Sequence, residues 1–457
     1  NLVITNQDEF LIGRGPDSLL SRTYNSQGAL DGDNNDGWRL GVARRVFGLT
    51  GSQDTAGSTI TRIDWDGSQV VYHWDADHNA YVSTEGAGAY DKLKKIDASW
   101  VWQDGDSRTI EIYEASGVTG EFRLATLEDI DGRKLTFSYN GSGYISRVTT
   151  LDGGYTDLTW SGSKLTQLTT TYWDTATSSY KTQTRTRYAY DGQNRLSTVT
   201  VDLSPTDNSI SDGRTYVTSY TYHGTSTRVA SISQTDGSRI DIAYEASGAY
   251  RVTSITQTVA AGVSRTTSYN YVSSTRTDVT DADGRVIRLD YNASGWLTKI
   301  TEPAATVGGT PQVREFTYDV RGNVTRIQTS PTTWIEYRYE DADGNGALGS
   351  DSDGNGLRAD DYGLGTHEYR HSGSNLYLAA RRTYNGQKLL LTDTRYQSLD
   401  SNSGDAVMPA NPLTTRYVYD AEGHLRFVVS PDGDVTRHDY APNGSLIQTT
   451  TFTGAGY

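Results

Sequence analysis

One repeated pattern constrains the fold of this chain more than its composition does. Each copy has Tyr followed directly by Asp or Asn, Gly or Asn at the fourth position after the Tyr, an aliphatic residue at the sixth, and Val or Ile at the ninth. The strict copies begin Tyr139-Asn140 with Gly143, Tyr190-Asp191 with Asn194, Tyr291-Asn292 with Gly295, Tyr318-Asp319 with Gly322, and Tyr419-Asp420 with Gly423. Looser copies start at Tyr113, Tyr244, Tyr384 and Tyr440. Such recurrence indicates a repeat architecture, in which each unit stacks on its neighbours.

The chemistry of each copy predicts a β-hairpin. Before the turn, rings alternate with other residues, as in Tyr188-Ala189-Tyr190, so both rings lie on one face of a strand. Asp or Asn then opens the turn, and Gly or Asn supplies the positive φ that closes it. The two aliphatic residues that follow are three apart, which predicts either a β-bulge or partial cover of both faces. A shorter Asp-Gly turn follows most copies: Asp152-Gly153, Asp236-Gly237, Asp283-Gly284 and Asp432-Gly433.

The composition favours strands throughout. Only 35% of the residues are hydrophobic, yet the chain has 32 Tyr, 9 Trp and 7 Phe, which excludes a disordered chain. Tyr therefore has to build much of the core, and each buried phenol needs a partner for its hydroxyl. Helix signals are nearly absent, whereas Thr, Ser, Gly, Tyr and Val favour strands and turns. We predict an all-β chain of antiparallel hairpins with one continuous core.

The charge and cysteine content exclude several kinds of function. With 41 Lys+Arg against 56 Asp+Glu, the net charge is −15, which argues against nucleic acid and anionic membranes as partners. No apolar run approaches the roughly 18 residues of a membrane span, and the residues from Asn1 do not resemble a signal peptide. The absence of Cys excludes disulfides and thiolate sites.

With its Tyr-Asp repeats, the chain resembles the Rhs family, whose units are called YD repeats. The segment from Gly13 to Ser26, which contains Arg22-Thr23-Tyr24-Asn25-Ser26, is similar to the family's N-terminal motif, and Gly37-Trp38-Arg39-Leu40 is similar to the element that follows it. The resemblance implies a spiral β-sheet that forms a hollow shell, partial or complete. It also implies an opening segment at 1–45, an aromatic-rich β region at 46–130 and a repeat shell at 131–457, interrupted by an acidic loop at 341–361.

The family resemblance implies a shell that encloses a toxic segment in bacterial toxins, or an adhesion scaffold as in teneurins, and carbohydrate binding has been proposed for the repeats. None of the 9 Pro residues follows Asp, so the family's Asp-Pro self-cleavage segment and an internal cargo are not carried over. The chain is short for a closed shell, and a free sheet edge needs cover. We therefore expect the missing wall to come from more of the same gene product, a second subunit or self-association.

Two acidic loops are candidate Ca²⁺ sites of structural role. Each begins with oxygen ligands at positions 1, 3 and 5 and Gly at position 6, as calcium loops do. The Glu expected at position 12 is missing, and an Asp at position 11 would have to close each site. The alternative is a solvated Asp/Gly turn cluster. The candidate ligands are Asp341, Asp343, Asn345, Asp351, Asp353, Asn355 and Asp361.

The remaining candidates give weaker signals. The acidic stretch from Asp31 to Asp36 is a weaker candidate for ligating a cation and is expected to form a loop. A metal patch of His73 and His78 with Asp75 and Asp77 has no fixed ligand spacing in strands. The alternating Trp100-Val101-Trp102 is expected to line the inside of the sheet rather than bind sugars. No nucleophile elbow or phosphate loop is present.

These observations lead to three hypotheses of function. The first is a non-enzymatic shell segment, exported or at a bacterial surface, that protects a polypeptide cargo. The second is an adhesion or glycan-binding scaffold. The third is a hydrolase with a carboxylate pair hidden among the acidic residues.

Overall fold

The computed structural model describes residues 2–27, 34–76, 78–83, 91–105, 107–260, 262–306, 308–319, 322–339, 365–372, 375–385, 389–396, 412–421, 423–441 and 446–453. These residues form antiparallel β-structure almost throughout, and the helical turn η2 (Pro205–Asp207) is one 3-10 turn between strands. Among them, no helix is long and apolar enough to cross a membrane. The predicted all-β fold class is confirmed.

The chain divides into two compact units. Unit 1 comprises Asn1–Ser83, Asp91–Asn270 and Thr280–Gly284. Unit 2 comprises Thr84–Tyr90, Tyr271–Val279 and Arg285–Tyr457.

Unit 1 opens with a separate three-stranded sheet, the N-terminal sheet, of order β1-β2-β3. Its strands are β1 (Val3–Leu11), β2 (Ser18–Asn25) and β3 (Trp38–Leu40). The next strands each pair with their neighbour in the chain, and β11 also pairs with β4, so these strands form a closed ring. The ring strands are β4 (Arg45–Thr50), β5 (Thr59–Ile63), β6 (Gln69–Asp75), β7 (Ala80–Val82), β8 (Lys92–Ile96), β9 (Ser99–Gln103), β10 (Ile110–Ala115) and β11 (Glu121–Glu128).

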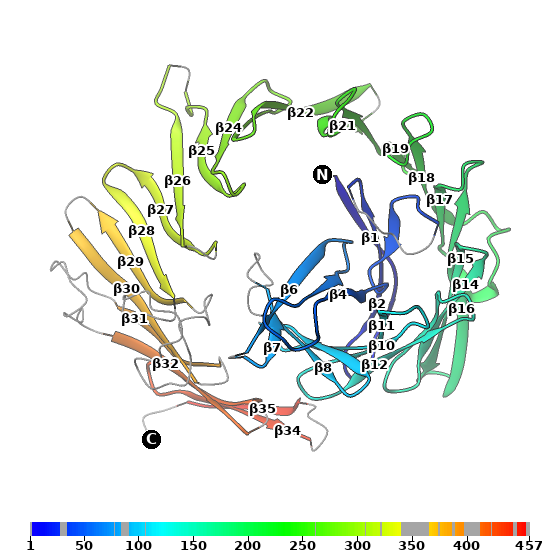
Figure 1. Ribbon diagram of the computed structural model, residues 1–457, viewed down its shortest axis with the longest axis horizontal. Helices are drawn as coiled ribbons and strands as arrows, with labels where there is room; N and C mark the ends of the chain where they lie inside the picture. Colours follow the sequence, from blue (N-terminus) through cyan, green and yellow to red (C-terminus); the bar gives the residue numbers. More distant parts are fainter. Residues whose placement is uncertain are drawn as a thin grey trace. The chain divides into compact units, whose positions relative to one another are not determined.

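From β11 the sheet of unit 1 continues as a meander of antiparallel neighbours. Its strands are β12 (Lys134–Tyr139), β13 (Ile145–Thr149), β14 (Tyr155–Ser161), β15 (Lys164–Asp174), β16 (Ser179–Tyr190), β17 (Leu196–Asp202), β18 (Thr215–Tyr222), β19 (Val229–Gln234), β20 (Arg239–Tyr244), β21 (Val252–Ala260) and β22 (Val263–Ser273). The N-terminal sheet, dark blue in Figure 1, lies against one face of this meander, as the contacts below show.

Unit 2 is a meander of the same kind. Strand β23 (Arg276–Thr280) lies at the division between the units. The following strands are β24 (Val286–Tyr291), β25 (Leu297–Glu302), β26 (Gln312–Tyr318), β27 (Val324–Ser330), β28 (Thr333–Tyr339), β29 (Gly365–Ser372), β30 (Asn375–Tyr384), β31 (Leu390–Tyr396), β32 (Pro412–Tyr419), β33 (Leu425–Val429), β34 (Val435–Tyr440) and β35 (Leu446–Phe452). Each pairs antiparallel with the next.

A β-bulge explains the spacing of the two aliphatic residues in each repeat. In the hairpin of β12 and β13, Tyr139 pairs with Ile145 and Phe137 pairs with Val148, and the register shifts between them. One strand therefore advances three residues while its partner advances two, which places both aliphatic residues on the face that carries the rings. The same shift occurs at the tyrosines of the other strict copies, Tyr190, Tyr291, Tyr318 and Tyr419.

The turns of the strict copies share one geometry. In the first copy, the side chain of Asn140 accepts hydrogen bonds from the backbone N–H groups of Ser142 and Tyr144 at 3.0 Å. Gly143 has φ of 87°, and Asn194 occupies the equivalent position of the second copy at 65°. Asn tolerates this left-handed conformation better than other residues with a side chain.

Most of the repeat tyrosines join successive hairpins through their hydroxyls. Each phenol donates a hydrogen bond to a backbone carbonyl of the preceding strand, and we call this series the phenol ladder. Burial raises the pKa of Tyr139, Tyr222, Tyr244, Tyr318 and Tyr339, in the case of Tyr339 to about 12, so these phenols remain protonated donors. The donor and acceptor pairs are Tyr139 to Leu124, Tyr190 to Leu165, Tyr222 to Leu196, Tyr244 to Val229, Tyr318 to Leu297, Tyr339 to Val324, Tyr384 to Gly365, Tyr419 to Leu390 and Tyr440 to Leu425.

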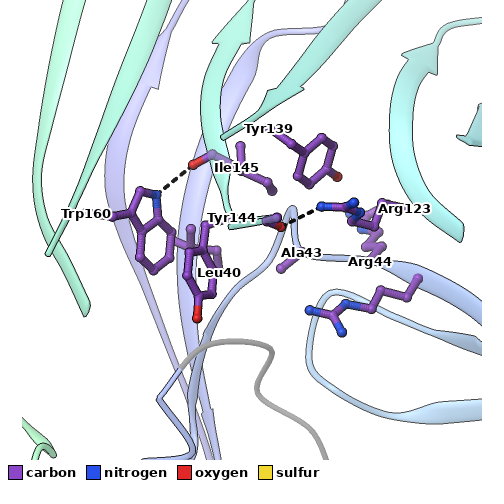
Figure 2. A pocket seen from close by; sticks show the side chains of 10 residues that line it. Leu40, Ala43, Arg44, Arg123, Tyr139, Tyr144, Ile145 and Trp160 are labelled. Atoms are coloured by element: carbon purple, nitrogen blue, oxygen red, sulfur yellow. Dashed lines mark hydrogen bonds between the residues drawn. The ribbon is translucent and has the colours of Figure 1, made fainter. Parts of the chain in front are cut away.

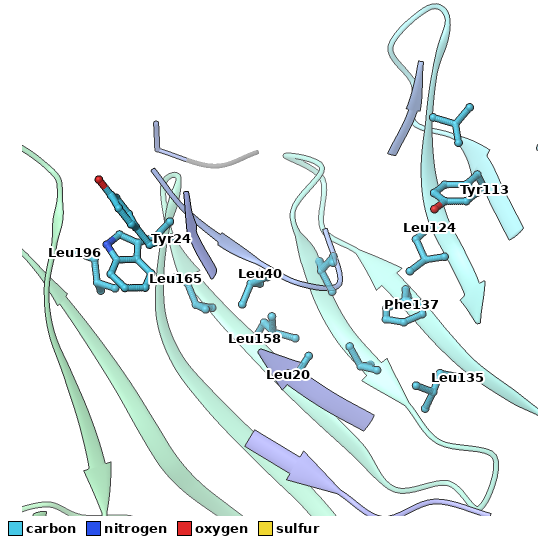
Figure 3. Packing of buried hydrophobic residues seen from close by; sticks show 14 of the residues in the cluster. Leu20, Tyr24, Leu40, Tyr113, Leu124, Leu135, Phe137, Leu158, Leu165 and Leu196 are labelled. Carbon is cyan, nitrogen blue, oxygen red and sulfur yellow. The ribbon is translucent and has the colours of Figure 1, made fainter. Parts of the chain in front are cut away.

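The hydrophobic core lies in unit 1. It joins the inside of the closed ring to the interface between the N-terminal sheet and the meander (Figure 3). In unit 2, by contrast, the buried apolar side chains among the described residues are Tyr369, Leu378 and Ala380. The expected continuous core is therefore wrong for the described residues. The physical reason within unit 1 is that the N-terminal sheet covers the repeat hairpins there and buries their rings.

Candidate functional site

The tyrosine-lined face of unit 1 holds the N-terminal sheet through a buried ion pair. The Arg22 guanidinium donates to both carboxylate oxygens of Asp8, at 2.9 and 3.1 Å. The Tyr188 hydroxyl donates to Asp8 at 2.7 Å, and Arg22 donates to the Tyr220 hydroxyl at 2.9 Å. Burial alone would lower the pKa of Arg22, but Asp8 and the neighbouring phenols together raise it, so Arg22 stays charged.

Aromatic and backbone contacts extend this interface. The Trp38 ring lies 4.7 Å from the Tyr220 ring, and its indole N–H donates to the Tyr222 hydroxyl at 3.0 Å. The Tyr24 hydroxyl donates to the Thr227 carbonyl at 3.0 Å. Because these groups belong to the N-terminal sheet on one side and to the repeat hairpins on the other, the face binds a polypeptide segment through its tyrosines.

The same repeat positions differ in burial between the two units. In unit 1, the exposed fractions of Phe137 and Val148 are 5% and 0%. Their counterparts in unit 2, Phe316 and Ile327, are only half-buried, as are the counterparts in the hairpin of β32 and β33. The repeat positions therefore carry apolar side chains in both units, but among the described residues of unit 2 these side chains are only half-buried.

A second buried charge cluster lies inside the closed ring. The Arg62 guanidinium donates to Glu111 at 2.8 Å and to the Tyr113 hydroxyl at 2.9 Å, and it lies 3.7 Å from the centre of the Trp102 ring. Arg44 and Tyr113 also hydrogen-bond Glu111. Burial lowers the pKa of Arg44, and the nearby Arg62 charge adds to the effect. These groups satisfy one another, so the cluster holds the ring together rather than presenting a reactive group.

The stability of the closed ring depends on pH through Asp91. Its carboxylate accepts hydrogen bonds from the Gly105 N–H at 3.0 Å and the Tyr72 hydroxyl at 3.3 Å. Burial, with the nearby Asp104 charge, raises the pKa of Asp91 from 3.8 to about 6. Between pH 3.8 and about 6, the folded chain therefore keeps a proton on Asp91 that the unfolded chain has already lost. As the pH rises through this range, Asp91 lowers the free energy of unfolding.

Replacing Asp91 with Asn should remove this loss of stability. We expect Asp91→Asn to match the parent near pH 4 and to exceed it at pH 7 by up to about 3 kcal/mol, the equivalent of roughly two pKa units. Chemical unfolding at both pH values measures the difference. Asp104→Asn keeps the titrating carboxyl and should retain most of the pH dependence. Identical pH profiles for Asp91→Asn and the parent would contradict the prediction.

A small cleft lies where the ring meets the first repeat hairpin. Its volume is about 20 Å³, enough for one water molecule. Arg44 and Arg123 extend toward it, and the rings of Tyr144 and Trp160 stack beside it at 4.6 Å (Figure 2). Arg123 donates to the Gly143 carbonyl at 2.8 Å, and Arg44 pairs with Glu111. Because both arginines already bind groups within the protein, the cleft connects the ring to the hairpin and has a structural role.

A larger groove lies between β1 and the hairpin of β15 and β16. Its volume is about 500 Å³, and its lining includes Glu9, Tyr172, Gln183 and Arg185. Glu9 is 8% exposed, and burial raises the pKa of its carboxyl. The Glu9 carboxylate accepts a hydrogen bond from the Phe10 N–H at 3.2 Å. A buried carboxylate on an edge strand opposes the addition of a further strand there.

The structure tests only part of the sequence-predicted site residues. All the proposed calcium ligands, from Asp341 to Asp361, lie outside the described residues. In the part of the chain that is described, no group of three or more His, Asp or Glu side chains could hold a metal ion. His78 pairs with Asp75 at 2.9 Å, and His367 and His371 lie on strand β29.

The aromatic and acidic candidates have structural roles where they are described. Trp100 and Trp102 are buried inside the ring, as predicted, whereas Trp65 is 39% exposed. Asp36, from the acidic stretch before Trp38, is buried and accepts hydrogen bonds from the backbone N–H groups of Trp38 and Leu196. Sequence reasoning missed this role of Asp36, together with the repeat hairpins that start at Tyr222 and Tyr339.

Comparison with known proteins identifies the repeat. Residues 275–307, which include the strict copy at Tyr291, match the RHS repeat family. The chain contains an RHS repeat. The bulged hairpin of this matched segment recurs in both units. No curated protein matches the chain in sequence.

Several solved structures are similar to this RHS-repeat chain at low identity. The crystal structure of TcdB2-TccC3 is 12% identical, with 96% of this chain and 23% of that chain covered, at a TM-score of 0.42. The crystal structure of TcdB2-TccC3-Cdc42 is 11% identical, with 95% of this chain and 27% of that chain covered, at a TM-score of 0.38. A porin-like protein from Bacteroides uniformis is 11% identical, with 67% of this chain and 94% of that chain covered, at a TM-score of 0.20. The RHS-repeat chain thus spans about a quarter of the two TcdB2-TccC3 structures. At these TM-scores the likeness establishes no function.

Proposed function

We propose that this RHS-repeat chain is a wall segment of an exported protein shell, and that its tyrosine-lined face holds a polypeptide in an incompletely folded state. The observation that carries the proposal is the difference in cover between the units. Unit 1 binds a polypeptide segment, its own N-terminal sheet, on the face that unit 2 leaves half-exposed. An apolar face of this extent favours a covering partner.

The role proposed is steric rather than catalytic. The repeat face offers rings and aliphatic side chains, which bind extended polypeptides without demanding one sequence. A polypeptide held in this way would be shielded from proteases. The resemblance to shells that enclose toxic segments supports a toxin-like cargo, and further wall would come from another segment or subunit.

A cysteine placed on the face tests this proposal, because the chain contains 0 Cys. Phe316→Cys puts a thiol on the repeat face, and Thr317→Cys puts one on the opposite face of the same strand. We expect a saturating unfolded polypeptide, such as a reduced and carboxymethylated protein, to slow maleimide labelling at position 316 about tenfold or more and to leave position 317 unchanged. Equal rates at 316 with and without the polypeptide would contradict the proposal.

A further inference from the structure

One position in each repeat faces whatever covers the sheet. It lies two residues before the repeat tyrosine, and we call it the leading position. In unit 1, β16 and β18 carry Tyr188 and Tyr220 there. The registers show how this position advances, since Tyr188 pairs with Val199 and Val199 pairs with Thr218, two residues before Tyr220. Leading positions therefore form one oblique row on the covered face.

The leading tyrosines of unit 1 bind a charged pair. Tyr188 donates its hydroxyl to the Asp8 carboxylate at 2.7 Å, and Tyr220 accepts a hydrogen bond from Arg22 at 2.9 Å. Their hydroxyls are thus used by the covering segment. The tyrosines that follow at Tyr190 and Tyr222 belong instead to the phenol ladder.

Unit 2 repeats this row on successive hairpins. The leading positions of β28, β30, β32 and β34 are Tyr337, Arg382, Tyr417 and His438. The row advances as in unit 1, because Arg382 pairs with Asp393, and Asp393 pairs with Thr415, two residues before Tyr417.

The hydroxyls of Tyr337 and Tyr417 differ from those of their unit 1 counterparts. Both side chains are half-buried, and neither hydroxyl bonds another residue in the described part of the chain. The ladder tyrosines on the same strands, Tyr339 and Tyr419, donate to Val324 and Leu390. The two leading phenols are therefore available donors on a face that is only half-buried among the described residues of unit 2.

The charge between the two phenols is positive. Arg382 lies 3.7 Å from Asp393, and Asp393 also pairs with Arg395 at 3.2 Å. One carboxylate is thus shared by two guanidinium groups, which leaves a net charge of +1 in a chain whose overall charge is −15. This local charge favours an anionic partner.

We propose that Tyr337, Arg382 and Tyr417 bind the side-chain carboxylates of an extended acidic polypeptide segment that crosses the strands of unit 2. This inference rests on the proposed function and names the chemistry of the partner. Alternate strands lie about 10 Å apart, so carboxylates three or four residues apart in an extended segment match the row. The bond from Tyr188 to Asp8 shows the same contact within this protein.

A pair of matched peptides tests the inference on the full chain. The probe is a fluorescent peptide of Thr and Val with Glu at every fourth position, and its partner has Gln in place of Glu. We expect the Glu peptide to bind about tenfold more tightly, the usual effect of a hydrogen bond to a charged group. Tyr337→Phe and Tyr417→Phe should each weaken binding of the Glu peptide by about tenfold and leave binding of the Gln peptide unchanged. Tyr155→Phe, on the opposite face of the sheet in unit 1, is the control.

Three results would overturn the inference. The first is equal affinity for the two peptides or no binding of either. The second is binding of the Glu peptide that neither Tyr337→Phe nor Tyr417→Phe weakens. The third is binding that is lost in Tyr188→Phe or Tyr220→Phe instead, which would place the peptide on the face of unit 1. If Phe316→Cys is still protected from labelling in any of these cases, the proposed function stands and only the recognition of carboxylates fails.

Discussion

Alanine in place of Asp8 should destabilise unit 1 by about 3–5 kcal/mol, the usual cost of leaving a buried charge without its partner. Arg22 is 5% exposed and would keep its charge beside Tyr220, through its hydroxyl and ring, and the ring of Trp38. Chemical unfolding followed by tryptophan fluorescence measures the change. Trp38 is a suitable reporter, because the Arg22 guanidinium lies 4.6 Å from its ring.

Removing both members of the Asp8–Arg22 pair should lower the free energy of unfolding far less than removing one of them. Replacing both partners, in Asp8→Leu with Arg22→Met, removes the buried charge and should restore most of the stability. The double variant therefore separates the cost of an unpaired charge from the cost of lost packing. A loss below about 1 kcal/mol for Asp8→Ala would show that the pair is not buried as described.

Alanine in place of Glu111 should cost a similar amount, about 3–5 kcal/mol, inside the closed ring. The side chain of Glu111 is fully buried, and its loss leaves Arg62 and Arg44 to share one described carboxylate, that of the partly exposed Asp64. We expect faster hydrogen exchange across β9, β10 and β11, which Glu111 holds against β5. Differential scanning calorimetry and exchange measurements on the full chain test both parts.

A matched control lies on the neighbouring strand. Glu121 pairs with Arg45 at 3.4 Å, and both side chains are 24% exposed. Glu121→Ala should therefore cost no more than about 1 kcal/mol, as partly exposed ion pairs do. If Glu111→Ala and Glu121→Ala reduced the unfolding free energy equally, burial would not be what sets the strength of these pairs.

The hairpins could be predicted from the sequence because their determinants are local. Tyr139, Asn140 and Gly143 lie within one turn, and the alternation before them is enough to assign the strand and its face. The bulge was one of two open alternatives. The register of Ile145 and Val148 decides between them, and that depends on pairing across strands.

The covered face could not be predicted, because its determinants are distant in sequence. Asp8 meets Tyr188, and Arg22 meets Tyr220, across a sheet that no local pattern relates to the N-terminal strands. The sequence places Asp36 in an acidic loop, but it does not show that the Asp36 carboxylate accepts a hydrogen bond from the distant Leu196 N–H. The partners of the phenols were missed for the same reason. The sequence shows a Tyr that needs a hydrogen bond, but not that the acceptor is a carbonyl of the preceding strand.

The phenol ladder has a consequence for how such chains can change in length. Each rung, such as the bond from Tyr318 to the Leu297 carbonyl, joins a hairpin only to the strand just before it, and the acceptor is backbone. A duplicated or deleted hairpin therefore finds the acceptor it needs in any neighbour, whatever the side chains there. Interactions limited to nearest neighbours let repeat proteins gain or lose whole units without redesign. Selection could thus adjust the reach of this wall one hairpin at a time.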